Sequence, residues 1–186
     1  MKILTIFFLG ISFFLTSTIM AKSEKKNGLV VEKYSNGKIK TKINYKKGKK
    51  EGHYKKFYSN GKLKIEGNYK NNKKEGIIKE WHKNGKLKIL RTYKDGKKNG
   101  KFQEWYKNGK LKHEGFYKNN KREGFYKEMY KNGVLKAEIN YKNDKPEGKV
   151  KKWYNNKQMK NIKIYKKGVI IETIKEWDKK GHLIKR

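Results

Sequence analysis

The stretch Glu-Trp-Tyr-Lys-Asn-Gly-Lys-Leu-Lys at residues 104–112 is followed by His113 and by Glu-Gly-Phe-Tyr-Lys-Asn-Asn-Lys-Arg-Glu-Gly at residues 114–124. Related segments recur along the chain with a period of 24 residues, and no insertion breaks the register. An Asn-Gly pair recurs at 36–37, 60–61, 84–85, 108–109 and 132–133. The repeat glycines are Gly28, Gly52, Gly76, Gly100, Gly124 and Gly148, and Glu172 ends their series. Such a period indicates a repeat protein.

Each unit predicts a β-hairpin. Residues 102–106 form its first strand, the Asn-Gly pair at 108–109 supplies the positive φ angles of a tight turn, and residues 111–117 form its second strand. A second turn, such as residues 94–97, leads to the next unit because Asn, Asp and Gly favour left-handed backbone. A helical alternative is weak, since glycine and asparagine interrupt the pattern every ten or so residues.

Aromatic and apolar side chains also follow the period, and we expect them to hold the strands together through cross-strand pairs of about 0.2–1 kcal/mol each. A Leu-type column accompanies a tyrosine column and a tryptophan column that also contains Phe57 and Met129. The two aromatic columns include Tyr45, Tyr69, Tyr93, Tyr117, Tyr141 and Tyr165, and Trp81, Trp105, Trp153 and Trp177.

Stacked hairpins predict an all-β fold, an elongated single-layer twisted antiparallel sheet of tandem 24-residue hairpins. Six units and a partial seventh give about thirteen strands and a length of about 60 Å. The two ends depart from the repeat, because residues 29–31 and 169–171 are unusually apolar. We expect these segments to act as terminal caps.

Composition excludes several classes of protein. The 186 residues contain 52 Lys and Arg against 17 Asp and Glu, a formal charge of +35, and no cysteine. A disulfide scaffold and cysteine-based chemistry are therefore excluded. Aromatic residues make up 13% of the chain, which argues against a disordered polyelectrolyte. Nearly all basic residues are lysines, whose mobile point charge suits polyanions better than bidentate recognition of bases.

The N terminus predicts export. Met1 and Lys2 precede an apolar run at residues 3–15, then a small polar stretch at 16–18, and then Ile19, Met20 and Ala21. This order is typical of a signal peptide cleaved after residue 21. The alternative is an N-terminal membrane anchor, because residues 3–21 are just long enough to span a bilayer. We expect residues 22–27 to be a short linker, residues 28–186 to be the repeat domain, and the protein to be a bacterial periplasmic, envelope or secreted protein.

The units at 104–112 and 114–124 resemble the MORN repeat family, in the bacterial variant that includes proteins labelled YwqK-type antitoxins. The resemblance covers residues 28–186. It implies hairpin repeats of the kind that serve as scaffolds, membrane-associated modules and partner-binding surfaces. The antitoxin label implies a toxin protein as partner.

Catalytic chemistry is not expected. His53, His82, His113 and His182 occupy four different positions of the unit, so the repeat does not gather them into a metal site. Glu66, Glu114 and Glu138 form a partial column beside lysines, which favours charge pairing over acid–base work. Glu51, Glu75, Glu123 and Glu147 precede the repeat glycines and fit turn residues. We therefore predict a protein that is not an enzyme and has no cofactor and no metal.

Lysine also repeats in fixed columns. One column follows the Leu-type residues directly, on the opposite face from them, and another follows the tyrosines. With about 10 Å between units, each column becomes a ladder of charge at a spacing close to the Debye length. The alternative is that these lysines only keep the sheet soluble. The candidate binding residues are Lys40, Lys64, Lys88, Lys112, Lys136 and Lys160, and Lys46, Lys70, Lys94, Lys118, Lys142 and Lys166.

Three functional hypotheses follow. The first is an exported scaffold that binds an acidic protein, a polysaccharide or an anionic lipid through its lysine and aromatic columns. The second is an antitoxin that binds and neutralises a toxin protein. The third is non-specific binding of nucleic acid, which the export signal and the scarcity of arginine disfavour. The free edges of the sheet also allow self-association.

Overall fold

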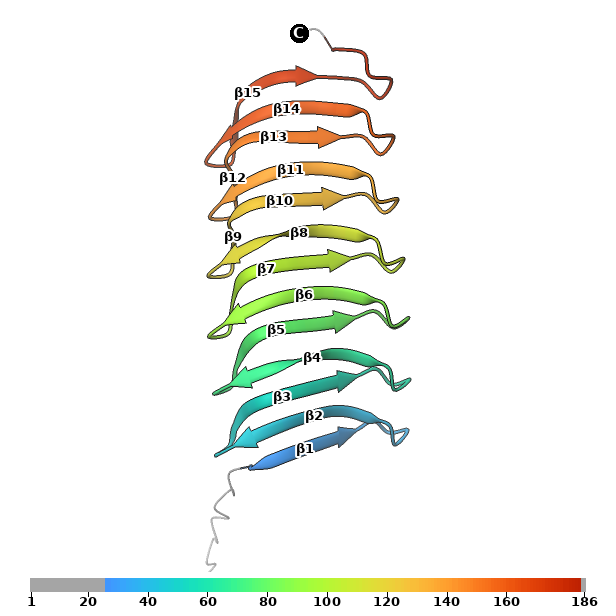
Figure 1. The fold of residues 1–186 in the computed structure, drawn as a ribbon, viewed down its shortest axis with the longest axis vertical. Helices are drawn as coiled ribbons and strands as arrows, with labels where there is room; N and C mark the ends of the chain where they lie inside the picture. Colours follow the sequence, from blue (N-terminus) through green and yellow to red (C-terminus); the bar gives the residue numbers. More distant parts are fainter. Residues whose placement is uncertain (1–25, 185–186) are drawn as a thin grey trace, which may run out of the picture.

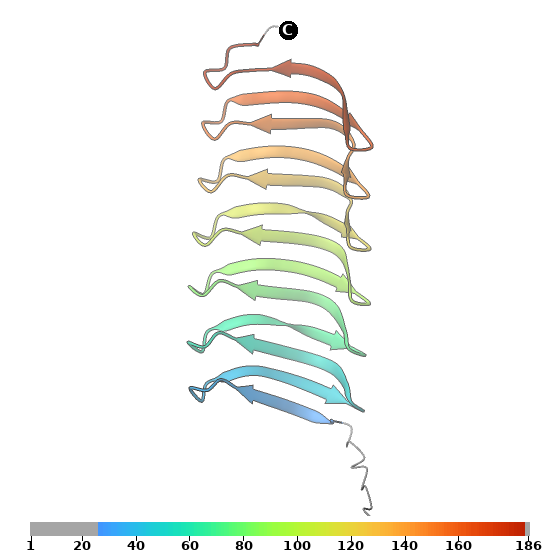
Figure 2. The same cartoon turned by 180° about the vertical axis from the view of Figure 1, so that it is seen from behind.

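The computed structural model describes residues 26–184, and they form one open antiparallel sheet whose strands follow one another in chain order. Figures 1 and 2 show this single layer from its two sides, with the hairpins stacked along the long axis. The regular structure of residues 26–184 consists entirely of β-strands. The predicted single-layer sheet of tandem hairpins is confirmed, and the part of the chain that the structure describes contains no helix able to span a membrane.

Most units contribute one first strand and one second strand. The strands are β1 (Gly28–Lys33), β2 (Ile39–Lys46), β3 (Lys49–Phe57), β4 (Leu63–Lys70), β5 (Lys73–Trp81), β6 (Leu87–Lys94), β7 (Lys97–Trp105), β8 (Leu111–Lys118), β9 (Lys121–Arg122), β10 (Gly124–Met129), β11 (Leu135–Lys142), β12 (Lys145–Pro146), β13 (Gly148–Trp153), β14 (Met159–Lys166) and β15 (Val169–Glu176). The short strands β9 and β12 precede β10 and β13 as the first parts of interrupted strands. The sheet therefore has thirteen strand positions along its main path, as the sequence predicts.

Two kinds of turn join the strands. At one edge, Asn108 Oδ1 accepts a hydrogen bond from the Lys110 amide at 3.0 Å, and Gly109 takes a φ of 90°. At the other edge, two residues form the whole turn, as where Asp95 and Gly96 take φ angles of 51° and 79°. Positive φ at both central residues is the conformation that matches the twist of a hairpin. These two edges are the long sides of the sheet, along which the strands end, and neither is an edge strand. We call the first the Asn-Gly edge and the second the two-residue edge.

The first strand of each inner unit is distorted at its repeat glycine. In the pairing of β6 with β7, Arg91 lies opposite Phe102 and Tyr93 lies opposite Lys98. Two extra residues of β7 are thus accommodated around Gly100, whose φ is 109°. In the next units the same irregularity separates β9 from β10 and β12 from β13. Figure 1 shows the resulting curvature of the strands.

The core lies along one face of the sheet. Four deeply buried side chains come from equivalent positions of first strands, and their exposed fractions are 2% for Tyr54, 1% for Ile78, 4% for Phe102 and 1% for Val150. Tyr126 takes the same position in β10 and is half-buried. Directly opposed residues of an antiparallel pair share a face, so Phe102 covers Gly115 and Tyr54 covers Gly67. A Cβ atom at Gly67 would collide with the side chain of Ile78.

The predicted aromatic columns contribute unequally to this core. Tyr93 and Tyr141 are buried, whereas Tyr69 and Tyr117 are half-buried. The predicted tryptophan column is half-buried as well, at Trp81, Trp105 and Trp153. The column formed by Tyr54, Ile78, Phe102 and Val150, which the sequence analysis did not single out, forms the deepest part of the core.

Neighbouring units are also joined by side-chain hydrogen bonds to the main chain. The hydroxyl of Tyr106 donates to the carbonyl of Met129 at 2.9 Å, 23 residues ahead. His82 takes the same position and lies 2.9 Å from the Trp105 carbonyl through Nε2. The other members of this ladder are Tyr34, Tyr58, Tyr130 and Tyr154, which donate to Phe57, Trp81, Trp153 and Trp177.

The apolar segments predicted as caps lie on the two edge strands. Leu29 and Val31 belong to β1 and are 57% and 43% exposed, and Val169 and Ile171 belong to β15 and are 66% and 60% exposed. Val30, between Leu29 and Val31, is half-buried and lies opposite the buried Ile43, so this side chain extends the core face at the first edge strand. Self-association through the two edge strands stays a prediction. Lys26 and Asn27, in the predicted linker, contact the first hairpin, since Asn27 Oδ1 accepts from the Lys47 amide at 2.7 Å. The predicted export signal at 1–21 lies outside the described residues.

Candidate functional site

The two-residue edge places lysines directly opposite one another. The residue before each turn and the residue after it form the last pair of the hairpin, so two like charges face each other across the strands. We call these residues the lysine edge. Its pairs are Lys46 with Lys49, Lys70 with Lys73, Lys94 with Lys97, Lys118 with Lys121, and Lys142 with Lys145. In the last unit Val169 lies opposite Lys166 and ends the pairing.

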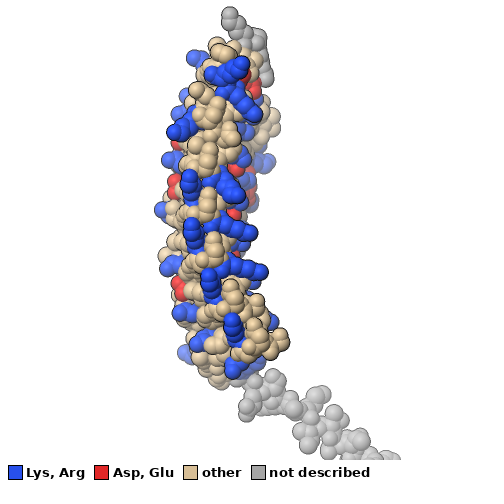
Figure 3. Space-filling view, turned by 90° about the vertical axis from the view of Figure 1, so that its right-hand side faces the viewer, with Lys and Arg blue, Asp and Glu red and all other residues tan. Residues whose placement is uncertain are grey.

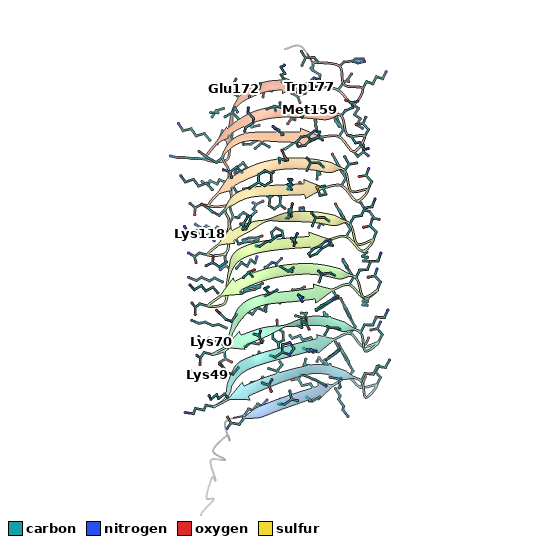
Figure 4. All side chains as sticks on the ribbon, in the orientation of Figure 1. Lys49, Lys70, Lys118, Met159, Glu172 and Trp177 are labelled. Atoms are coloured by element: carbon teal, nitrogen blue, oxygen red, sulfur yellow. The ribbon has the colours of Figure 1, made fainter. Side chains whose placement is uncertain are left out.

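Every side chain of the lysine edge is exposed. Figure 4 shows the labelled Lys49, Lys70 and Lys118 along this side of the sheet. None of the ten lysines forms an ion pair with an acidic group of residues 26–184. Like charges directly opposite each other destabilise a sheet. Repeating that arrangement in five successive hairpins creates a positively charged edge whose repulsion a bound anion would relieve.

Shallow clefts lie between consecutive turns of this edge. One of about 300 Å³ is lined by Lys46, Lys47, Lys49, Glu51 and Asn71. A second, of about 480 Å³, lies near the other end of the sheet and is lined by Lys121, Lys142, Asn143, Lys145, Glu147 and Lys167. Both therefore combine several ammonium groups with one carboxylate.

The carboxylates in these clefts hold the turns. Glu51 Oε2 accepts a hydrogen bond from the Asn71 amide at 2.7 Å, and Glu147 Oε2 accepts one from the Lys167 amide at 2.7 Å. Glu75 and Glu123 bind the amides of Asp95 and Asn143 in the same way. The prediction that these glutamates are turn residues is therefore confirmed. Each one fixes the turn of the following unit and so positions the lysines beside it.

The two predicted lysine columns differ in the contacts that their side chains make: the column that follows the tyrosines lies on the lysine edge, whereas the column that begins at Lys40 contacts other side chains. Lys112 has no partner in the register between Glu104–His113 and Trp105–Leu111, so it occupies a β-bulge. Its Nζ lies 3.0 Å from Glu104 Oε1, and Lys136 Nζ lies 2.7 Å from Glu128 Oε1. Lysines of this column also lie over tyrosine rings, at 5.4 to 5.8 Å from the ring centres: Lys64, Lys112, Lys136 and Lys160 over Tyr58, Tyr106, Tyr130 and Tyr154.

The Lys40 column is therefore largely committed to contacts within the protein. The Asn-Gly edge, which faces the viewer in Figure 3, also carries lysines along its length. Lys38, Lys86 and Lys110 donate through Nζ to the carbonyls of Asn60, Asn108 and Asn132. The lysine edge thus differs from the other two sets in making no ion pair or Nζ hydrogen bond within residues 26–184.

Sequence reasoning found only one row of the lysine edge. It treated residues such as Lys97 as part of a turn, whereas Lys97 begins β7 and lies opposite Lys94. The Lys-x-x-Lys spacing around a two-residue turn is the signal that predicts this opposition. The residue that follows each lysine after the two-residue turn is also basic in several units, and its cation lies over a ring of the tyrosine column. Lys50 Nζ lies 5.3 Å from the centre of the Tyr69 ring, and the Arg122 guanidinium lies 3.9 Å from the centre of the Tyr141 ring.

Within residues 26–184, no group of three or more His, Asp and Glu side chains has the arrangement needed to hold a metal ion. His113 is half-buried and its Nδ1 lies 2.8 Å from the Tyr126 hydroxyl. Burial lowers the pKa of His113, although Glu104 and Glu128 act in the opposite direction. Glu66 lies 3.8 Å from Lys79, which confirms charge pairing for this member of its column.

Comparison with protein families explains the repeated geometry. The sequence profile described as the MORN repeat variant matches six segments, residues 26–47, 50–71, 74–95, 98–119, 122–143 and 146–167. The chain belongs to the MORN repeat variant family. Each matched MORN segment ends within a two-residue turn, as at Asn71 and Asp95, so the boundaries of the family unit fall at the lysine edge.

The MORN assignment makes the protein a repeat scaffold of a kind that usually serves as a binding module, and not a member of a known enzyme class. No curated protein matches the chain. The antitoxin association that the resemblance implied does not accompany the MORN assignment and stays a prediction.

Proposed function

We propose that this protein is an exported, non-enzymatic MORN scaffold that binds an extended polyanion along the lysine edge. The single observation that carries the proposal is the series of five directly opposed lysine pairs in consecutive hairpins. A scaffold that needed lysine only for solubility would gain nothing from placing like charges face to face. A bound anion offsets the repulsion, because both lysines of an opposed pair can then contact the same ligand.

The geometry favours a long ligand. Successive pairs repeat at about 10 Å, and a charge field screened over about 8 Å is continuous along such a row. The row follows one edge of the sheet, so it presents a line of charge. An acidic polysaccharide matches a line better than a compact acidic domain does. A lipid surface could meet the same edge, and the experiment below distinguishes these two ligands.

Binding of polygalacturonate, measured by calorimetry at increasing salt, tests the proposal. We expect the affinity to fall steeply with ionic strength because the contacts are between exposed charges. Replacing Lys70, Lys94 and Lys118 together by glutamine removes one ammonium group from each of three opposed pairs. If each contributes the roughly 1 kcal/mol that a lysine gains at an anionic surface, the affinity falls about a hundredfold.

The matched control replaces Lys64, Lys112 and Lys136 by glutamine. It changes the net charge by the same amount, but these three side chains lie over Tyr58, Tyr106 and Tyr130. We expect little loss of affinity. Equal losses in the two triple variants would show that only net charge matters and would contradict the proposal. Preference for vesicles containing anionic lipid over polygalacturonate would instead assign the edge to a membrane surface.

Export is the second part of the proposal and rests on the order of residue types at 1–21. Intact mass and N-terminal sequencing of the protein from each fraction of the producing cell test it. We expect a chain that begins at Lys22 outside the cytoplasm. A chain that retains Met1 in the inner membrane would make the segment an anchor, and a soluble cytoplasmic chain that retains Met1 would contradict export and favour the antitoxin hypothesis.

A further inference from the structure

One row of residues crosses the core face of the sheet from strand to strand. Its members lie directly opposite one another in successive pairs, so they share a face. In the second half of the molecule the row runs Glu104, His113, Glu128, Ala137, Lys152, Asn161 and Glu176. Inner first strands thus contribute an acid in two of these units, and β13 contributes Lys152 instead.

The change at Lys152 removes an ion pair that the two preceding units have. Glu104 binds Lys112 and Glu128 binds Lys136, each pair being eight residues apart. The equivalent pair in the next unit is Lys152 and Lys160, two cations. Lys160 Nζ lies 5.4 Å from the centre of the Tyr154 ring, and Lys152 is half-buried without an ion-pair partner among residues 26–184.

The neighbours of Lys152 in the row are also unusual. Ala137 lies opposite it on one side, where other units have the larger Ile65, Ile89 or His113. Asn161 lies opposite it on the other side and is only 5% exposed. The Oδ1 atom of Asn161 accepts no hydrogen bond. A buried acceptor without a donor costs free energy, so this position next to Lys152 is less well satisfied than the rest of the row.

A pocket of about 240 Å³ lies at this place. It is lined by Glu128, Tyr130, Lys136, Ala137, Lys152, Trp153 and Lys160. Glu128 is paired with Lys136, so the charge that remains is that of Lys152 and Lys160. Two aromatic side chains complete the walls. The volume is smaller than that of pockets for drug-sized ligands and suits a single ring.

We propose that this pocket binds one acidic sugar residue, a six-membered ring that carries a carboxylate. Its carboxylate meets Lys152 and Lys160, and one face of its ring packs on Trp153. The site is independent of the lysine edge, because Lys152 lies next to the Asn-Gly end of β13 and the lysine edge lies at the opposite ends of the strands.

Titration of the protein with D-glucuronate, followed through the indole N–H signals of its tryptophans, tests the proposal. We expect the Trp153 signal to move selectively. D-glucose supplies the ring without the charge, and acetate supplies the charge without the ring. Each should move the Trp153 signal much less at the same concentration.

Variants that restore the residue of another unit keep the fold and remove the site. Lys152→Glu recreates the pair seen between Glu128 and Lys136, and we expect it to weaken glucuronate binding about tenfold or more. The matched control is Lys56→Glu, at the equivalent position of β3, where Phe57 and Ile65 stand in place of Trp153 and Asn161.

A second control concerns the other side of Trp153. That side chain also borders a pocket of about 420 Å³ that includes Val134, which replaces the bridging lysine of earlier turns. Val134→Lys should leave glucuronate binding unchanged. The proposal is wrong if glucose or acetate moves the Trp153 signal as strongly as glucuronate does. It is equally wrong if Lys56→Glu or Val134→Lys weakens binding as much as Lys152→Glu, or if no titration moves the signal.

Discussion

Strands β7 and β15 accommodate the same number of extra residues in different ways. In β7 both extra residues lie around Gly100, whose φ is 109°, and Phe102 stays in register opposite Arg91 with 4% exposure. In β15 Glu172 stands at the glycine position, without a positive φ, and the register shifts at two separate places. Lys163 therefore pairs with Thr173, and Ile174, the equivalent of Phe102, is 40% exposed.

This comparison shows how the fold keeps its core in register. A residue in the left-handed region lets the strand change direction within one position, so the buried column beyond it is not displaced. Without that residue, the excess length is distributed along the strand. The edge position of β15 adds to the exposure of Ile174, but it does not explain the two register shifts. The repeat glycine therefore determines which apolar side chains reach the core.

The largest expected effect comes from truncating the two equivalent side chains. Phe102→Ala should lower the free energy of unfolding by about 3–5 kcal/mol, because it empties a fully packed site. Ile174→Ala should cost less than about 1 kcal/mol, since much of that side chain already contacts water. Urea denaturation followed by tryptophan fluorescence measures both. Similar losses would show that β15 packs as β7 does and would break the comparison.

Exchanging the residues at the glycine position tests whether this residue determines the register of the strand. Gly100→Glu should cost about 1–2 kcal/mol or more, because an L-residue is strained in the left-handed region and its Cβ would lie 3.2 Å from Thr92 Cβ. Glu172→Gly should cost nothing and should move Ile174 into register. Amide hydrogen exchange at residues 172–175 reports this change as increased protection. Unchanged protection would indicate that the edge position alone disorders the register.

A smaller effect distinguishes the middle of the sheet from its end. Tyr106→Phe removes the bond to the Met129 carbonyl and should lower global stability by about 1 kcal/mol. Tyr154→Phe removes the equivalent bond to Trp177, at 3.0 Å, which joins only the terminal unit. We expect that variant to increase hydrogen exchange in β15 while leaving the main unfolding transition in place. A uniform loss in both variants would mean that the units do not respond separately.

The smallest effect concerns pH. His113 is packed against Tyr126 and faces Glu104, Glu128, Lys112 and Lys136, and burial lowers its pKa in the folded protein. The unfolded chain therefore takes up the proton first as the pH falls through about 6.5. The stability contribution of neutral His113 is present above that pH and is lost below it.

Melting temperatures between pH 5 and 8 should therefore decline at the acidic end, and His113→Gln should flatten the decline. The exposed His53 provides the matched control, and His53→Gln should leave the profile unchanged. If the two variants give the same profile, the pH dependence does not originate at His113.

The sequence predicts those parts of the fold in which residue identity repeats. Asn108 and Gly109 recur in nearly every unit, so the period, the hairpins and the single sheet follow directly. The deepest core column does not repeat by identity, since it reads Tyr54, Ile78, Phe102, Tyr126 and Val150. Identity-based columns favoured the tryptophans instead, which are half-buried. In the core, the sizes of neighbouring side chains match although the residue types differ from unit to unit. Gly67, for example, leaves room for the side chains of Tyr54 and Ile78.

The candidate site was predicted in part. Lys94 and Lys118 were recognised as members of a ladder, but their opposition to Lys97 and Lys121 required the register of the turn. The bulge that brings Lys112 to Glu104 was not visible in strict alternation, because a bulge changes the direction of the side chain. The pocket at Lys152 depends on Ala137 and Lys152, which differ from their counterparts in the two preceding units. Each change reads as ordinary variation until the strands are aligned.

The tyrosine ladder and the strand order have a mechanical consequence. The hydrogen bonds between strands run along the long axis of the molecule, so a pull on the two ends loads them one pair after another. Under such a load the hairpins should detach singly, starting at an edge strand, at low and nearly constant force. Each detached unit would release 24 residues of chain, which makes the molecule an extensible tether instead of a stiff strut.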